Sequence, residues 1–233
     1  ETSHVLIIWL VDNSHSNLDP HVADTVSFTV SAPLNYITIA EARAQAVGTN
    51  ATVRGIVTTP NFQTDNTEYG LQDNSGGIVI FHFGEPYASL AVGDSVEVSG
   101  TLLEYMGKFE IEPASDDDIT IISQNNPLPA FQAITVASLV ANGEDYESEL
   151  IRINGASITS GTWPTSQSAN LYISDDGGTD TVAMRIDSDM DIIGNPEPAA
   201  PFDVQGIAGQ YTTYQILPRY YTDFTPATDV VEV

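Results

Sequence analysis

The chain has 233 residues, with 6 lysines and arginines against 32 aspartates and glutamates, and a formal net charge of −26. Proteins that bind nucleic acids gain most of their affinity by neutralising phosphates with lysine and arginine, so a chain with so few cations is not expected to bind a nucleic acid. For the same reason it is not expected to bind an anionic membrane surface. Because 42% of the residues are hydrophobic and only 16% are charged, the chain can bury a core and does not have the composition of a disordered acidic tail.

The residue usage indicates an exported protein. There is no cysteine, which excludes disulfides and thiolate metal sites, and Lys108 is the single lysine among many Thr, Ser, Asn, Gly and Asp residues. We therefore expect an extracellular or cell-surface protein of a bacterium or an archaeon. The longest apolar run, residues 5–11, falls well short of a membrane span, which needs about 18 residues.

The first 32 residues differ from the rest of the chain. An apolar run at residues 4–13, the segment Asn-Leu-Asp-Pro at 17–20 and the alternating run at 24–30 resemble the last two strands of a bacterial immunoglobulin-like domain. Two strands alone are marginally stable in water, so an upstream segment, another surface of this chain or a neighbouring molecule must complete the sheet. Completion by a neighbour is β-strand addition, which builds a polymer when the contact does not close. The predicted interface residues are Val5, Ile7, Trp9 and Val11.

The remaining chain is predicted to consist mainly of short strands. Runs at residues 51–57, 77–83 and 94–100 alternate or cluster β-branched and aromatic residues between turn residues. Two stretches, residues 37–46 and 134–142, favour short helices, because a threonine stands before an alanine-rich segment where a helix N-cap is needed.

These two helical stretches each begin one copy of an internal repeat. Ile-Thr at 37–38 matches Ile-Thr at 134–135, and a strand ending near a glycine follows each, at Gly55 and at Gly155. Further along, the run that begins at Tyr69 matches the run that begins at Leu171, and the run from residue 92 matches the run from residue 201. Finally, Lys-Phe-Glu-Ile-Glu-Pro from 108 matches Thr-Tyr-Gln-Ile-Leu-Pro from 213. The repeat predicts domains at residues 1–32, 33–133 and 134–226, with a β-prone tail at 227–233.

Each copy carries about five strands, which suits a small closed barrel such as the OB fold. The motifs Val-Arg-Gly-Ile-Val at 53–57, Tyr-Gly-Leu-Gln-Asp-Asn-Ser-Gly-Gly-Ile at 69–78 and Phe-Glu-Ile-Glu-Pro at 109–113 resemble the OB-fold domains of secreted bacterial proteins, which often stand beside extracellular nucleases or in surface arrays. The first copy matches closely and the second loosely. The predicted fold class is all-β, with two tandem OB-like five-stranded barrels, short helices and an N-terminal immunoglobulin-like hairpin.

Acidic clusters are the candidate metal sites, because Ca²⁺ takes six to eight oxygen ligands in irregular geometry. Alternating aspartates in the second copy resemble the first half of an EF-hand loop, but Ile192 stands where that loop needs glycine. Solvated acidic loops are the alternative interpretation. The predicted calcium ligands are Asp175, Asp176, Asp180, Asp187, Asp189 and Asp191, with a second cluster at Asp116, Asp117 and Asp118.

Aromatic residues near the second and third strands are candidates for ligand binding, since OB folds bind ligands on that face. Tyr69, Trp163 and Tyr172 are the predicted ligand-binding residues, whereas Phe81 and Phe83 are predicted to face the core. With few cations nearby, an oligosaccharide suits such a site better than a nucleic acid. Tyr220 and Tyr221 are either interface anchors or part of a strand packed at a barrel end.

No catalytic constellation is recognisable. His15 and His21 could share a metal, but their loop has no zinc-type spacing, and solvated histidines are the simpler interpretation. The first functional hypothesis is a non-enzymatic subunit of a cell-surface filament, joined by strand complementation between copies. The alternative is an accessory OB-fold module of a secreted nuclease or hydrolase that binds a glycan or a nucleic acid.

Overall fold

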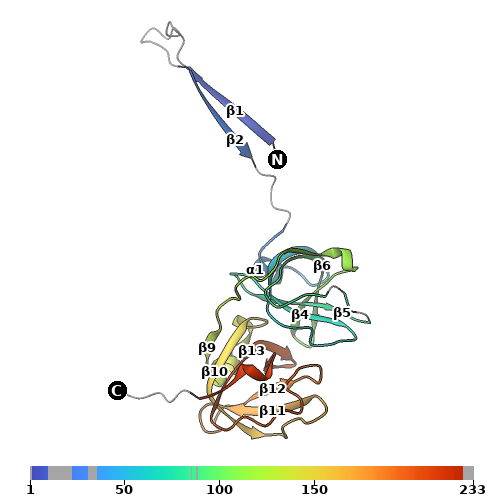
Figure 1. Cartoon of the computed structure of the whole chain (residues 1–233), viewed down its shortest axis with the longest axis vertical. Helices are drawn as coiled ribbons and strands as arrows, with labels where there is room; N and C mark the ends of the chain where they lie inside the picture. The colour runs from blue at the N-terminus through green and yellow to red at the C-terminus, as the bar shows by residue number, and fades with distance from the viewer. Residues whose placement is uncertain (1, 10–22, 31–35, 85, 88, 228–233) are drawn as a thin grey trace, which may run out of the picture. The chain divides into compact units, whose positions relative to one another are not determined.

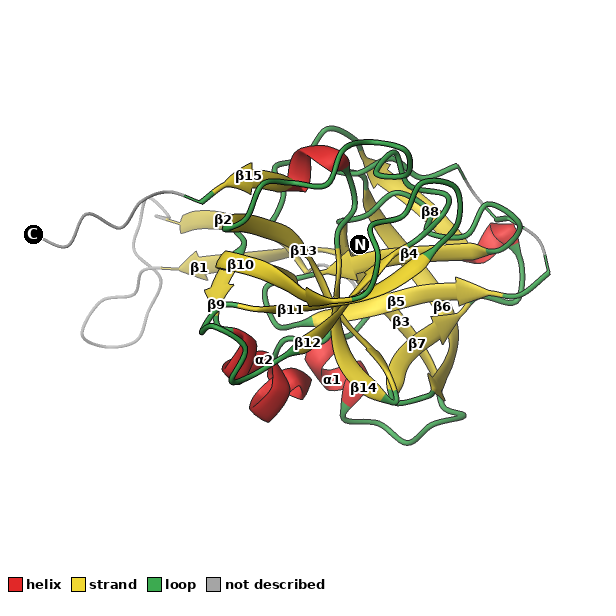
Figure 2. Ribbon diagram, turned by 90° about the horizontal axis from the view of Figure 1, so that it is seen from below, coloured by secondary structure: helices red, strands yellow, loops and turns green. Residues whose placement is uncertain are grey.

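The computed structural model describes residues 2–9, 23–30, 36–84, 86–87 and 89–227. The chain divides into two compact units, Glu1–Asn35 and Tyr36–Val233. Both units are built mostly of strands, and the helices are few and short (Figures 1 and 2). The predicted all-β class is confirmed.

The first unit contains a single pair of antiparallel strands in its described part. β1 (Thr2–Trp9) pairs with β2 (Ala23–Val30) from Thr2 opposite Val30 to Trp9 opposite Ala23. The predicted interface residues Val5, Ile7 and Trp9 belong to β1, whereas residue Val11 and the histidines at 15 and 21 lie outside the described residues.

The first sheet of the second unit contains a closed five-stranded barrel. Its barrel strands are β3 (Asn50–Val57), β4 (Thr67–Gln72), β5 (Gly77–His82), β6 (Ser95–Tyr105) and β7 (Lys108–Glu112). They follow the order β3-β4-β5-β7-β6, and β6 pairs back with β3. β8 (Ile119–Ser123) adds to the outside of β6. This order confirms the predicted OB-like barrel.

The second sheet spans β9 (Gln132–Ile134) to β15 (Phe224–Pro226), so it begins shortly before the predicted boundary at residue 134. Its other strands are β10 (Leu150–Ser160), β11 (Ala169–Ser174), β12 (Val182–Ile186), β13 (Phe202–Tyr211) and β14 (Thr213–Leu217). They follow the order β10-β11-β12-β14-β13, and β13 also pairs with β10.

A short helix with a threonine N-cap precedes β3 in the first sheet and β10 in the second, as predicted. α1 (Ile39–Arg43) begins after Thr38, whose side chain accepts from the Glu41 backbone, and α2 (Val136–Asn142) begins after Thr135. Both helices are shorter than the predicted segments. Three 3-10 turns are also present among the described residues, at Asp116–Asp118, Gly143–Asp145 and Tyr221–Asp223.

Two glycines allow the chain to cross itself closely at corresponding places. A β-carbon on Gly100 of β6 would lie 2.4 Å from the carbonyl oxygen of Glu112, and one on Gly206 of β13 would lie 2.3 Å from that of Leu217. A proline follows each of these carbonyls. No larger residue fits there without a shift of the backbone, so each sheet needs its glycine to close.

Each sheet encloses its own hydrophobic core. Ile39, Leu71 and Ile111 belong to the core of the first sheet, and Leu139, Ile153 and Phe202 to that of the second. Phe62, which lies between β3 and β4 of the first sheet, packs into the second core. The two sheets therefore share apolar packing within one unit.

Candidate functional site

Polar contacts fix the two sheets against each other. Arg43 of α1 pairs at 2.8 Å with both Glu144 and Glu147, and Glu147 also accepts from the Phe109 backbone N–H at 2.9 Å. A β-carbon on Gly77 would lie 2.3 Å from the carbonyl oxygen of Ser148, so the backbones touch here. Surfaces that face each other across this junction therefore have a defined geometry.

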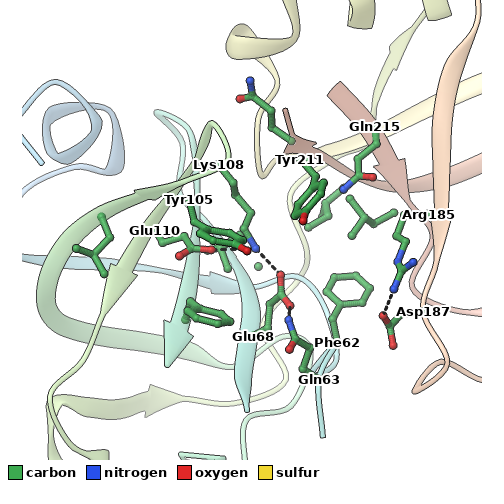
Figure 3. A pocket seen from close by; sticks show the side chains of 18 of the residues that line it. Phe62, Gln63, Glu68, Tyr105, Lys108, Glu110, Arg185, Asp187, Tyr211 and Gln215 are labelled. Atoms are coloured by element: carbon green, nitrogen blue, oxygen red, sulfur yellow. Dashed lines mark hydrogen bonds and ion pairs between the residues drawn. The ribbon is translucent and has the colours of Figure 1, made fainter. Parts of the chain in front are cut away.

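A groove of about 800 Å³ lies between the two sheets. One side is formed by β4, β5, β6 and β7 of the first sheet, and the other by residues of β11, β12, β13 and β14 of the second (Figure 3). Ligand pockets in proteins usually have volumes of roughly 300–1,000 Å³. The groove includes the β4–β5 face, which corresponds to the second and third barrel strands on which OB folds bind oligonucleotides and oligosaccharides.

The chain's single lysine lies in this groove with two carboxylates. The Lys108 ammonium is 2.5 Å from Glu68 and 2.9 Å from Glu110, and these three side chains are largely buried. The Gln63 amide also donates to Glu68. Glu68 accepts hydrogen bonds from Gln63 and Lys108, and Glu110 is held by its ion pair with Lys108, so both carboxylates have defined positions in the groove lining.

Burial and pairing act on the pKa values of this cluster in opposite directions. Burial raises the pKa of Glu110 above its ordinary value, and the Lys108 charge offsets only part of that rise. Burial acts to lower the pKa of Lys108, but the charges of Glu68 and Glu110 outweigh it and raise this pKa. The lysine therefore stays charged at neutral pH.

On the second sheet, Arg185 of β12 pairs with Asp187 at 3.1 Å. The groove lining thus holds two cations, Lys108 and Arg185, against five carboxylates. The carboxylates are Glu68, Glu104, Glu110, Glu112 and Asp187. The excess of negative charge repels anionic ligands.

Aromatic rings border the groove from both sheets. Tyr105 ends β6 and Tyr211 ends β13, and each is more than half exposed, at 53% and 55%. Their ring centroids are 6.2 Å apart and the rings are tilted by 58°. Phe83, 75% exposed, is a third accessible ring in the lining. The prediction that Phe83 faces the core is therefore wrong, because it follows the last residue of β5, where the barrel wall has ended.

Comparison with known proteins links part of this chain to a nuclease. No family model matches. The chain is 28% identical over 192 residues to "Endonuclease YhcR" of Bacillus subtilis (strain 168), and the match covers 80% of this chain and 16% of the endonuclease. The chain thus spans about a sixth of the length of this relative.

Solved structures add no argument about function. The hypothetical protein ygiW from E. coli matches 41% of this chain and 99% of its own at 22% identity, with a TM-score of 0.31. Aspartyl tRNA synthetase from Entamoeba histolytica covers 60% of this chain and 50% of its own at 11% identity, with a TM-score of 0.34.

The three predicted ligand-binding residues lie in different environments, and none lines the groove. Tyr69 and Trp163 are core residues with 5% and 8% of their surface exposed, and the Trp163 indole donates to the Asn195 carbonyl at 2.8 Å. Tyr172 is 47% exposed on β11. Tyr172 is therefore the accessible member of the predicted set.

The aspartates of the glycine-rich turn after β11 hold the backbone in place. Asp175 accepts from the Val136 N–H at 3.1 Å, at the start of α2. Asp176 accepts from the backbone N–H groups of Thr179 and Asp180, and hydrogen bonds from Ser174 and these groups lower the Asp176 pKa.

The alternating aspartates after β12 also have partners within the chain. Besides the Asp187 pair with Arg185, Asp189 accepts from the Thr64 N–H at 2.7 Å and Asp191 from the Tyr221 N–H at 2.7 Å. In the other acidic cluster, Asp116 and Asp117 open a 3-10 turn and Asp118 accepts from the Ser115 N–H at 3.0 Å. Within the described residues, no three acidic or histidine side chains converge as a metal would require. Calcium binding by these residues stays a prediction.

Tyr220 and Tyr221 pack within the chain. The Tyr220 ring lies 5.6 Å from the buried Arg219 guanidinium, and the Tyr221 hydroxyl donates to the Pro196 carbonyl at 2.9 Å. Tyr220 directly precedes a 3-10 turn and Tyr221 begins it, so neither lies in a strand, which was the alternative to an interface. Their role as interface anchors stays a prediction, and the tail after 227 lies outside the described residues.

Sequence reasoning missed Tyr105, Lys108, Glu110 and Tyr211. Two signals were present: one lysine stands among 32 acidic residues, and the two tyrosines occupy corresponding hairpin positions of the repeat. In the part of the chain that the structure describes, no helix is long and apolar enough to cross a membrane.

Proposed function

We propose that the chain is a non-catalytic ligand-binding module of an exported, larger protein of nuclease or hydrolase type, and that the groove between its sheets is the binding surface. The observation that carries this proposal is the groove itself, to which both sheets contribute charged side chains in ion pairs and exposed aromatic rings. The similarity to an endonuclease supports a role as one module of a larger protein, because the matched region is only 16% of that relative.

We propose further that the two sheets are tandem copies of one OB-type domain. The strand orders agree, and each copy repeats the threonine cap and the glycine crossing. Asp73 accepts from the Ile39 N–H at 3.0 Å, as Asp175 does from Val136 in the second copy. This agreement in strand order, helix caps, glycine crossings and turn aspartates favours duplication of one unit.

The absence of catalysis is part of this proposal. The two most buried carboxylates of the groove, Glu68 and Glu110, share the Lys108 ammonium, which forms an ion pair with each of them. Purified chain incubated with single-stranded and double-stranded DNA and RNA, with Mg²⁺ or Ca²⁺, should leave them intact. Cleavage that copurifies with the chain and is lost in Glu110→Gln would overturn this part.

A binding panel tests the module itself. The purified chain, at concentrations where light scattering shows monomers, is titrated with oligosaccharides, single-stranded DNA and a lysine-rich peptide. We expect saturable binding to one of these classes with one ligand per chain. If none binds at millimolar concentration, the chain is not a ligand-binding module.

The β1–β2 pair favours a second candidate, an extracellular subunit of a filament. Within the described residues, this pair forms a sheet of only two strands, which is marginal alone. We propose that it is the end of an immunoglobulin-like sheet completed by other strands. Electron microscopy of the full chain and of a truncated chain of residues 36–233, each with and without Ca²⁺, distinguishes the two candidates. Filaments formed by the full chain but not by the truncated chain would support polymerisation. Monomers in both samples would exclude it.

A further inference from the structure

We propose that the groove between the two sheets binds a segment of an uncharged oligosaccharide, with Tyr105 and Tyr211 as stacking platforms and the Glu68–Lys108–Glu110 cluster as the hydrogen-bonding centre. This inference rests on the proposed binding function and names its ligand class.

The charge of the groove decides against polyanions. Five carboxylates and two cations line it, and both cations already pair with carboxylates, Lys108 at 2.5 Å and Arg185 at 3.1 Å. A nucleic acid would bring phosphates to a surface with no unpaired cation to receive them. An uronic-acid polymer meets the same repulsion.

The polar centre suits hydroxyl groups. Sugar hydroxyls both donate and accept, and the cluster presents both functions, with carboxylate oxygens on Glu68 and Glu110 and an ammonium on Lys108. A purely apolar ligand would cover these charges without replacing their water, which is costly. A cationic ligand would have to compete with Lys108 for Glu68 and Glu110, and because Glu104 and Glu112 also line the groove, a hexalysine peptide is included among the comparison ligands.

The tyrosines supply the apolar part of the site. A pyranose ring has a face of C–H groups that packs on an aromatic ring, and the Tyr hydroxyl stays available to water or to the sugar. Tyr105 and Tyr211 come from the β6–β7 and β13–β14 hairpins, whose tips touch where the Thr212 N–H donates to the Met106 carbonyl at 2.6 Å. This contact holds the two tyrosine rings beside each other (Figure 3). A single oligosaccharide can therefore pack on both rings.

The test uses calorimetric titration of the full chain with neutral hexasaccharides of glucose, mannose, xylose and N-acetylglucosamine. A 20-nucleotide single-stranded DNA, hexagalacturonate and a hexalysine peptide are the comparison ligands. We expect one of the neutral hexasaccharides to bind. Tyr105→Ala and Tyr211→Ala should each weaken its affinity by about tenfold or more, as loss of a central aromatic contact does. Phenylalanine at either position should retain most of the affinity.

Tyr172→Ala is the matched control, because Tyr172 is exposed to a similar degree but does not line the groove. It should change the affinity less than twofold, and all variants should keep the thermal midpoint of the parent. Binding of a neutral hexasaccharide that is lost in Tyr172→Ala and kept in Tyr105→Ala overturns the proposed site. Binding of DNA, hexagalacturonate or hexalysine alone overturns the ligand class and leaves the module function standing. Binding of nothing overturns both.

Discussion

Arg43 of α1 forms a 2.8 Å ion pair with Glu147, whose side chain is completely buried between the two sheets. Removing one partner of a buried pair leaves an uncompensated charge, which costs about 3–5 kcal/mol of folding free energy. We expect this loss in Arg43→Ala, measured by urea unfolding. Arg54→Ala is the control, since Arg54 and Glu97 form a more exposed pair, and it should cost no more than about 1 kcal/mol. Equal losses in the two variants would show that the buried pair does not hold the sheets together.

Close backbone contact predicts a second effect at the same junction. Gly77→Ala places a methyl group 2.3 Å from the Ser148 carbonyl oxygen, so one sheet must move away from the other. We expect a loss of about 1–3 kcal/mol, as overpacking produces, and a broader thermal transition as the sheets unfold less cooperatively. Gly76→Ala is the matched control, because its nearest neighbour would be 3.8 Å away. A transition in Gly77→Ala as sharp and as high as in Gly76→Ala would contradict the packing argument.

Local features of this fold were predictable from the sequence, and the long-range ones were not. Thr38 and Thr135 mark helix starts because an N-cap acts within one turn, and strand alternation likewise depends only on neighbours. The approach of Tyr105 to Tyr211 depends on how the sheets dock, which contacts such as Arg43–Glu147 decide across about a hundred residues of chain.

Asp175 shows the same limit for the acidic turns. A carboxylate in a glycine-rich turn looks the same in sequence whether it binds a cation or caps a helix, and the position of α2 beside that turn makes it a cap. The repeat held a hint, since Asp73 occupies the corresponding turn.

Buried carboxylates predict a pH dependence of stability. Burial raises the pKa values of Glu110, Glu147 and Glu149 above the ordinary 4.5, so the folded chain binds these protons more tightly than the unfolded chain does. Their contribution is therefore fully present below about pH 4.5 and is lost as the pH rises through the folded-state values.

Glu110→Gln isolates one of these groups. The variant lacks the buried charge, so its thermal midpoint relative to the parent should be more favourable at pH 8 than at pH 5. Glu104→Gln removes an exposed carboxylate of the same groove and controls for the change in net charge. A difference between Glu110→Gln and the parent that is constant from pH 5 to pH 8 would show that Glu110 titrates alike in both states.

If the aspartates after β12 bind calcium, the midpoint of thermal unfolding should depend on Ca²⁺. Asp187, Asp189 and Asp191 each already have a partner within the chain. Asp189 binds Thr64 in the loop between β3 and β4, so a cation bound here would strengthen a contact between this loop and the second sheet. Ca²⁺ that binds only the folded state stabilises it by about 2.7 kcal/mol at a concentration a hundred times the dissociation constant, so millimolar Ca²⁺ should raise the midpoint and EDTA should remove the gain.

Asp189→Asn should abolish this shift of the midpoint. NaCl at equal ionic strength is the control for screening of the net charge of −26. Midpoints that are the same with EDTA and with Ca²⁺, or that follow ionic strength only, exclude the site and leave these carboxylates as backbone anchors.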